Sequence, residues 1–157
     1  MIVRVLAVLA VLSVAAAGVS GWFWWNSATA DFAAERDTVL SDGQRYAVDL
    51  NTVDYHSPDF DRWRNAATGA LLDRLNRNQE NDRANAVANK TVSTARVVTA
   101  AVTNLNSHSG SATMIAALEI TLSQGGGQAT AKISRLDMDL QRTDAGWKVS
   151  GLEVVGT

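Results

Sequence analysis

The hydrophobic positions of this chain change their spacing twice. Residues 2–25 are almost continuously apolar, residues 28–75 place apolar side chains at helical spacing, and residues 90–155 alternate in the manner of strands. Asparagine, a poor helix former, is frequent in residues 76–89, so this part is predicted to be either a frayed helix or a loop. Helices followed by consecutive antiparallel strands predict an α+β fold.

Four strands are predicted from the alternation in the second half. They lie at residues 90–105, 111–123, 129–142 and 147–155, and turn-forming segments such as NSHSGS and QGGGQ separate them. In the third strand the apolar positions change from odd to even numbers near Ser134, which predicts a β-bulge, and a similar change at Gly151 predicts a bend in the fourth. The helices are therefore expected in the concave face of a curved four-stranded antiparallel sheet.

The second helix is predicted to begin within the sequence SPDFDRW. Ser57 is a suitable N-cap, and Pro58 suits the first helical position. Asp59 and Asp61 would then lie in the first turn, where the helix dipole favours negative charge. The Thr-Gly pair at residues 68–69 is expected to break or bend this helix.

Residues 1–25 are predicted to be a transmembrane anchor, followed by one folded domain over residues 26–157. About 22 apolar residues rising about 1.5 Å each span roughly 33 Å, close to a hydrocarbon core of about 30 Å. Arg4 at one end and the tryptophans at the other favour a cytoplasmic N-terminus and a single-pass plasma-membrane protein whose C-terminal domain lies outside. A cleaved signal peptide is the alternative, with a candidate cleavage sequence at residues 28–30.

Composition narrows the functional classes. The chain has 157 residues, a formal net charge of −2 and no cysteine. Because it carries no basic block, nucleic-acid binding is not expected. The missing cysteines exclude a disulfide framework, a thiolate zinc site and a cysteine nucleophile within these residues.

Four polar side chains before and within the start of the second predicted helix form the candidate catalytic or metal site: Asp54, His56, Asp59 and Asp61. An imidazole beside carboxylates titrates near neutral pH and suits acid–base chemistry. However, a single histidine matches no usual zinc spacing, and the helix start already accounts for Asp59 and Asp61. His108 falls in a predicted hairpin turn. We therefore expect no catalytic, cofactor-binding or metal-binding residues, and no cofactor.

A second candidate is an apolar, lipid-sized pocket inside the fold. Its lining would comprise Phe60, Trp63, Leu71, Met114, Leu118, Met138 and Trp147. Ligand pockets are mostly apolar, but a domain of this size needs the same side chains to build its core. The core interpretation is therefore favoured, and an apolar ligand is kept as the alternative.

The order of segments and several motifs resemble the Mce-associated membrane proteins of mycobacteria and related actinobacteria. The most specific motifs are AVDLNTVDY at residues 47–55, the aspartates that follow, ATG at residues 67–69 and GWKVSGLEV at residues 146–154. The resemblance implies a nuclear-transport-factor-2-like cone, also called SnoaL-like, on the outer side of the plasma membrane. It also implies a non-enzymatic accessory role with Mce complexes, which import lipids across the cell envelope.

Three functions follow as hypotheses. The first is an anchored subunit that stabilises or docks onto an Mce-type lipid-import complex, with the complex subunits and the bilayer as partners. The second is a SnoaL-like extracytoplasmic enzyme or small-lipid-binding protein. The third is an assembly factor of a type IV secretion apparatus with the same anchor-and-cone layout, although shared architecture does not imply shared function.

Overall fold

The computed structural model describes residues 30–156, and its architecture is α+β. The chain divides into two compact units, Met1–Glu35 and Arg36–Thr157. Of the first unit only residues 30–35 are described, and they are helical. In the second unit residues 36–50 form the first helix, so the helical spacing that begins at residue 28 is confirmed as a helix over the described residues 30–50.

Two further helices follow the first. α2 covers Phe60–Ala66 and α3 covers Gly69–Ala88. α2 begins later than predicted, because the side chain of Asp59, and not that of Ser57, accepts a hydrogen bond from the backbone N–H of Arg62 at 3.2 Å. α3 continues through the asparagine-rich segment, so a helix rather than a loop occupies that part of the chain.

The predicted break between α2 and α3 is confirmed at residues 67–69. Gly69 has a φ of +54°, in the left-handed region that glycine adopts without a steric penalty. The backbone N–H of Thr68 donates to the carbonyl of Val149 at 2.8 Å. The junction between the two helices is therefore held against the last strand of the sheet.

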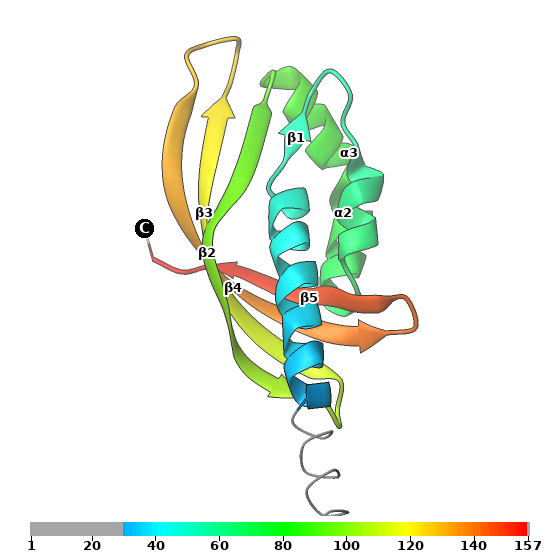
Figure 1. Ribbon diagram of the computed structural model, residues 1–157. Helices are drawn as coiled ribbons and strands as arrows, with labels where there is room; N and C mark the ends of the chain where they lie inside the picture. The colour runs from blue at the N-terminus through cyan, green and yellow to red at the C-terminus, as the bar shows by residue number, and fades with distance from the viewer. Residues whose placement is uncertain (1–29, 157) are drawn as a thin grey trace, which may run out of the picture. The chain divides into compact units, whose positions relative to one another are not determined.

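The sheet has five antiparallel strands arranged in sequence order (Figure 1). They are β1 Val53–Asp54, β2 Val92–Asn106, β3 Ser111–Ser123, β4 Thr130–Thr143 and β5 Gly146–Val154. The prediction of four strands is wrong, because the short β1 pairs with the start of β2 and places Val53 opposite Ser93. A segment this short produces no alternation that a sequence pattern can reveal.

The search for a membrane-spanning helix extends over the described residues. No helix within residues 30–156 is long and apolar enough to cross a membrane. The described architecture is three helices with a five-stranded sheet, which corrects the predicted four-stranded sheet. The predicted anchor at residues 1–25 lies outside the described residues.

One face of the sheet, called here the inner face, packs against the helices. It carries the even-numbered residues of β3 and β4, and the largest fully buried side chains on it are Met114, Leu118, Leu136, Met138 and Leu140. Val39 and Ala47 of the first helix, Leu71 of α3 and Trp147 of β5 belong to the same buried cluster. The opposite face, with the odd-numbered residues of β3 and β4, is called the outer face.

β4 has no bulge at the predicted position. It pairs with β3 without a register shift, with Leu118 opposite Ser134 and Glu119 opposite Ile133. The strand keeps one phase throughout, and Ile133 lies on the outer face, where it is 52% exposed. The predicted bulge near Ser134 is therefore wrong, because that prediction assumed that every apolar residue of the strand faces the core.

A register shift does occur in β5. Gly151 pairs with Asp139 and Val149 pairs with Leu140, which leaves Ser150 as the extra residue of a β-bulge. The predicted change of phase at Gly151 is thus confirmed to within a residue.

Candidate functional site

Asp54 and His56 form a pair at the surface. Nδ1 of His56 lies 2.7 Å from Oδ1 of Asp54, and the same oxygen accepts the backbone N–H of His56 at 2.9 Å. That backbone hydrogen bond, and then the contact with the imidazole, hold the pKa of Asp54 below its usual value. The side chains of His56 and Asp54 are 66% and 54% exposed. A pair so open to water offers a substrate no enclosed surface.

The two other predicted aspartates do not join this pair. Asp59 caps α2, and its Oδ2 lies 3.7 Å from Nε of Arg62. Asp61 forms an ion pair with Arg64, one turn along the same helix. Residues 30–156 contain no group of three or more histidine, aspartate or glutamate side chains placed to hold a metal ion. The four predicted residues therefore form one exposed pair and two separate carboxylates, one that caps α2 and one that forms an ion pair within it.

Asp59 and Asp61 line a shallow charged depression. The other residues that line it are Arg45, Tyr46, Asp49, Arg62, Asn65 and Lys148. Arg45 already contacts Asp42 and the hydroxyl of Tyr46, each at 2.9 Å, and Nζ of Lys148 donates to the carbonyl of Asn65. Because three basic side chains face three acidic ones here, the depression carries no excess charge for an ionic ligand.

Most of the apolar side chains considered for an internal pocket lie in the core. Met114, Leu118 and Met138 are 0% exposed, and they share one buried cluster with Leu71 and Trp147. The close packing of such side chains is what holds the helices on the inner face.

Phe60 and Trp63 pack against each other beside this cluster. Their ring centroids are 4.9 Å apart in an edge-on arrangement, and the indole Nε1 of Trp63 donates to the carbonyl of Thr52 at 3.0 Å. This contact links α2 to the segment after the first helix. His108 lies, as predicted, in the turn between β2 and β3, where its backbone N–H donates to the side chain of Asn106.

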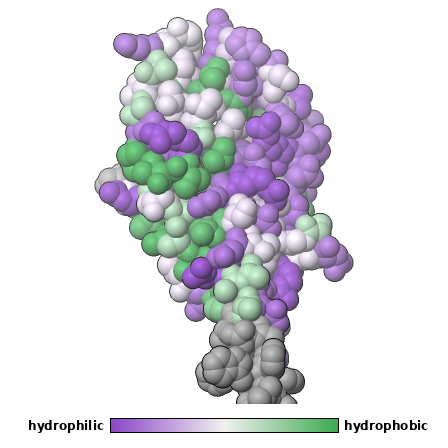
Figure 2. Space-filling model, in the orientation of Figure 1, coloured by the Kyte–Doolittle hydropathy of each residue, from purple (hydrophilic) through white to green (hydrophobic). Residues whose placement is uncertain are grey.

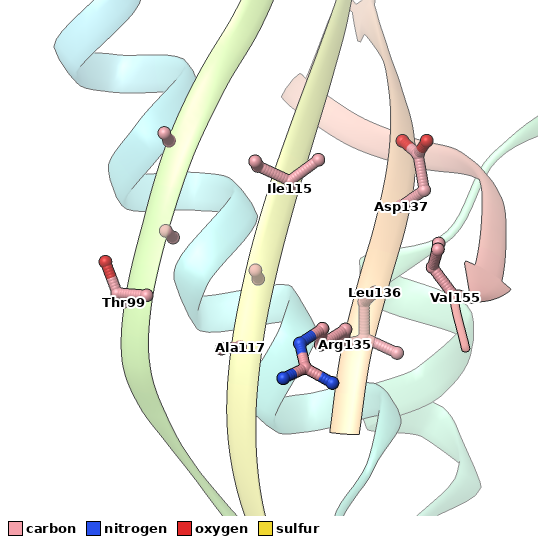
Figure 3. A pocket seen from close by; sticks show the side chains of 10 residues that line it. Thr99, Ile115, Ala117, Arg135, Leu136, Asp137 and Val155 are labelled. Atoms are coloured by element: carbon pink, nitrogen blue, oxygen red, sulfur yellow. The ribbon is translucent and has the colours of Figure 1, made fainter. Parts of the chain in front are cut away.

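An apolar groove lies on the outer face of the sheet, and Figure 3 shows the first helix behind the strands that form it. Its volume is about 340 Å³. The residues that line it are Thr99, Ala100, Ala101, Ile115, Ala116, Ala117, Arg135, Leu136, Asp137 and Val155. The four small alanines leave a hollow between Ile115 and Val155, which are 49% and 50% exposed.

Two opposite charges border this groove on β4. Figure 3 shows Arg135 and Asp137 directed towards different ends of it. Both are exposed, and neither side chain forms a hydrogen bond or an ion pair with another residue of the range 30–156. By contrast, Arg96 and Glu119 on the same face are paired across β2 and β3, with Nη2 and Oε2 2.7 Å apart.

The groove belongs to a wider difference between the sides of the molecule. In Figure 2 hydrophobic residues gather on the side formed by the strands, and mainly hydrophilic residues cover the side formed by α2 and α3. Exposed apolar patches of this kind mark sites of interaction. This surface was not among the predictions from the sequence. The apolar Ile133, out of phase with the core positions of β4, was the signal that could have revealed it.

Comparison with known proteins identifies the family. Residues 1–156 match the family described as "Uncharacterized protein Rv1363c/MT1408-like". The chain belongs to this family. The family is mycobacterial, which agrees with the actinobacterial part of the predicted resemblance, whereas association with Mce complexes is not part of the match. No curated protein matches the chain.

Several solved structures have a similar fold at low sequence identity. The periplasmic domain of DotI has a TM-score of 0.62 at 15% identity, covering 76% of this chain and 94% of that one. An IcmL-like type IV secretion system protein from Legionella pneumophila has a TM-score of 0.60 at 11% identity, covering 76% and 91%. A putative aromatic ring hydroxylase from Novosphingobium aromaticivorans has a TM-score of 0.57 at 17% identity, covering 80% and 92%. Proteins with such different names share the fold alone.

Proposed function

We propose that this protein is a non-enzymatic component of a membrane-associated assembly, and that its folded unit acts through protein contacts. The observation that carries the proposal is the apolar groove on the outer face, which lies opposite the core. The helices of the second unit pack on the inner face, so Ile115 and its neighbours are left half-exposed. An apolar surface that the fold itself does not cover suits a protein partner.

An extracytoplasmic enzyme is the competing hypothesis. It would require reactive polar groups that converge in an enclosed cavity. The side chains between the helices and the sheet are instead apolar and buried, and the Asp54–His56 pair is exposed at the surface. We therefore expect the double variant Asp54→Ala, His56→Ala to keep its biological activity. Loss of activity in that variant, with normal folding, would favour the enzyme.

Two kinds of assembly are compatible with a contact role. The fold shared with the periplasmic domain of DotI and with an IcmL-like type IV secretion system protein supports a secretion-type apparatus. An Mce-type lipid-import complex is supported by the sequence motifs alone. We favour the first kind, because its support comes from the three-dimensional arrangement of most of the chain.

We also propose that the folded unit works outside the plasma membrane. The charge and tryptophan pattern of residues 1–25 supports this location, and DotI provides a periplasmic domain of similar fold. Protease added to intact spheroplasts should then digest the C-terminal part of the chain without cell lysis. Protection of the folded unit until lysis would contradict the proposed location.

The contact role is tested by purifying the intact chain from detergent-solubilised membranes and identifying the proteins that accompany it. The wild-type chain is compared with Ile115→Arg, which places a charge in the groove, and with Arg77→Glu on the exposed surface of α3 as the control. Partners should be retained by the wild type and the control and lost with Ile115→Arg. Equal recovery with all three would overturn the proposal, and the identity of the partners decides between secretion and lipid import.

A further inference from the structure

The groove on the outer face is complementary to itself, and we propose that it is the interface of a symmetric dimer of this chain. This inference deepens the proposed contact function and rests on it. It commits to a second copy as the occupant because of how charge and side-chain size are distributed along the groove.

Two adjacent rows of residues cross β2, β3 and β4 in this groove. One row consists of Ala101, Ile115 and Asp137, and the next consists of Thr99, Ala117 and Arg135. Each row ends on β4 in a charged residue, and the two charges have opposite signs. On β3, the row with the negative charge carries the bulky Ile115, whereas the row with the positive charge carries the small Ala117.

Consider a two-fold axis that runs across the strands, midway between these rows. It would place each row of one copy over the other row of the second copy, as an isologous interface requires. Arg135 of one copy would meet Asp137 of the second copy, and the same contact would occur again by symmetry. Ile115 of one copy would lie over Ala117 of the other, so that the larger side chain enters the hollow left by the smaller one. Charge and shape are thus matched by the same operation.

The charges also explain why the groove suits a second copy. Arg135 and Asp137 form no ion pair within residues 30–156, although the nearby Arg96 and Glu119 do. Glu153 lies opposite Asp137 on β5 and adds a second carboxylate for the incoming arginine. Complementary charges at an interface fix the register of docking and disfavour wrong partners, and here both signs come from one surface.

The test is self-association of the full chain in detergent, measured by sedimentation velocity over a range of protein concentrations. The variants Arg135→Asp and Asp137→Arg each place like charges opposite each other, and each should weaken the dimer by roughly tenfold or more. Arg77→Asp, which makes the same change of charge on exposed α3, is the matched control and should dimerise like the wild type. An equimolar mixture of the two groove variants should recover dimers, because all facing charges are then opposite.

Recovery in the mixture also shows that both variants are folded. A wild-type chain that stays monomeric, single variants that dimerise as well as the wild type, or a mixture that fails to associate would each overturn the dimer. A monomer that carries a bound apolar ligand, detected by mass spectrometry, would overturn it in favour of a ligand groove.

Failure of the dimer and failure of the contact function give different results. If the chain is monomeric and Ile115→Arg still loses the proteins that accompany the wild type, the contact function stands and the dimer is wrong. If the chain dimerises through the groove and no other protein accompanies it, the dimer stands and the assembly role is wrong.

Discussion

The two faces of the same β-strands both carry apolar side chains, but the fold covers only one of them within residues 36–156. On the inner face Leu118 is 0% exposed, whereas on the outer face the adjacent Ile115 and Ala117 border an open groove. Burial of apolar surface drives folding, so the inner face accounts for the stability of the unit. The outer face contributes little to that stability and is available to a partner. Alternation along a strand separates two faces, but it does not show which of them will be covered.

The largest expected effect is on the inner face. Leu118→Ala removes a fully buried side chain and should lower the free energy of unfolding by about 2–5 kcal/mol. Ile115→Ala truncates a side chain of the same strand on the outer face and should change the free energy of unfolding by roughly 0.5 kcal/mol. Urea unfolding followed by tryptophan fluorescence measures both. Similar losses for the two variants would remove the distinction between the faces.

The next effect concerns how closely the first helix approaches the inner face. A side chain at Gly43 would place its Cβ 2.7 Å from Sδ and Cε of the buried Met114. Gly43→Val should therefore destabilise the fold by about 1–3 kcal/mol through overpacking. Ser41→Val introduces the same residue at an exposed position of this helix and is the control. Equal unfolding midpoints for the two variants would show that the helix can move away without loss.

A smaller effect is expected from the ion pair on the outer face. Glu119→Gln removes the contact with Arg96, whose side chain is 66% exposed, and should cost about 0.2–1 kcal/mol. The difference from the wild type should shrink at high salt, because solvent screens exposed charges. A loss as large as that of Leu118→Ala would mean that the outer face also stabilises the fold.

The smallest effect is expected for Asp54, in the short edge strand β1. Its folded-state pKa is lowered by the hydrogen bonds from His56, so the carboxylate stabilises the fold above the unfolded pKa. That contribution is lost as the pH falls through the folded pKa. The unfolding midpoints of the wild type and Asp54→Ala should therefore differ slightly at neutral pH and converge as the pH falls below the folded-state pKa of Asp54. A constant difference over this range would contradict the assignment.

The sequence by itself determined the features that depend on short stretches of backbone. The helical break at residues 67–69 follows from the freedom of glycine, and the phase change near Gly151 follows from strand alternation. The helix over residues 30–50, the long strands and their turns follow from apolar spacing. The proximity of Asp54 and His56 is also local, since they are two positions apart.

The tertiary structure decided the rest. β1 exists because β2 lies beside it, and Ile133 is half-exposed because the helices pack on the other face of the sheet. Asp59 and Asp61 contact Arg62 and Arg64 of α2 and do not contact His56. The groove combines three strands and the segment after β5, so no single stretch of sequence contains it. Such features depend on which segments, distant in the sequence, come into contact in the fold. Local backbone preferences and apolar spacing do not specify these contacts.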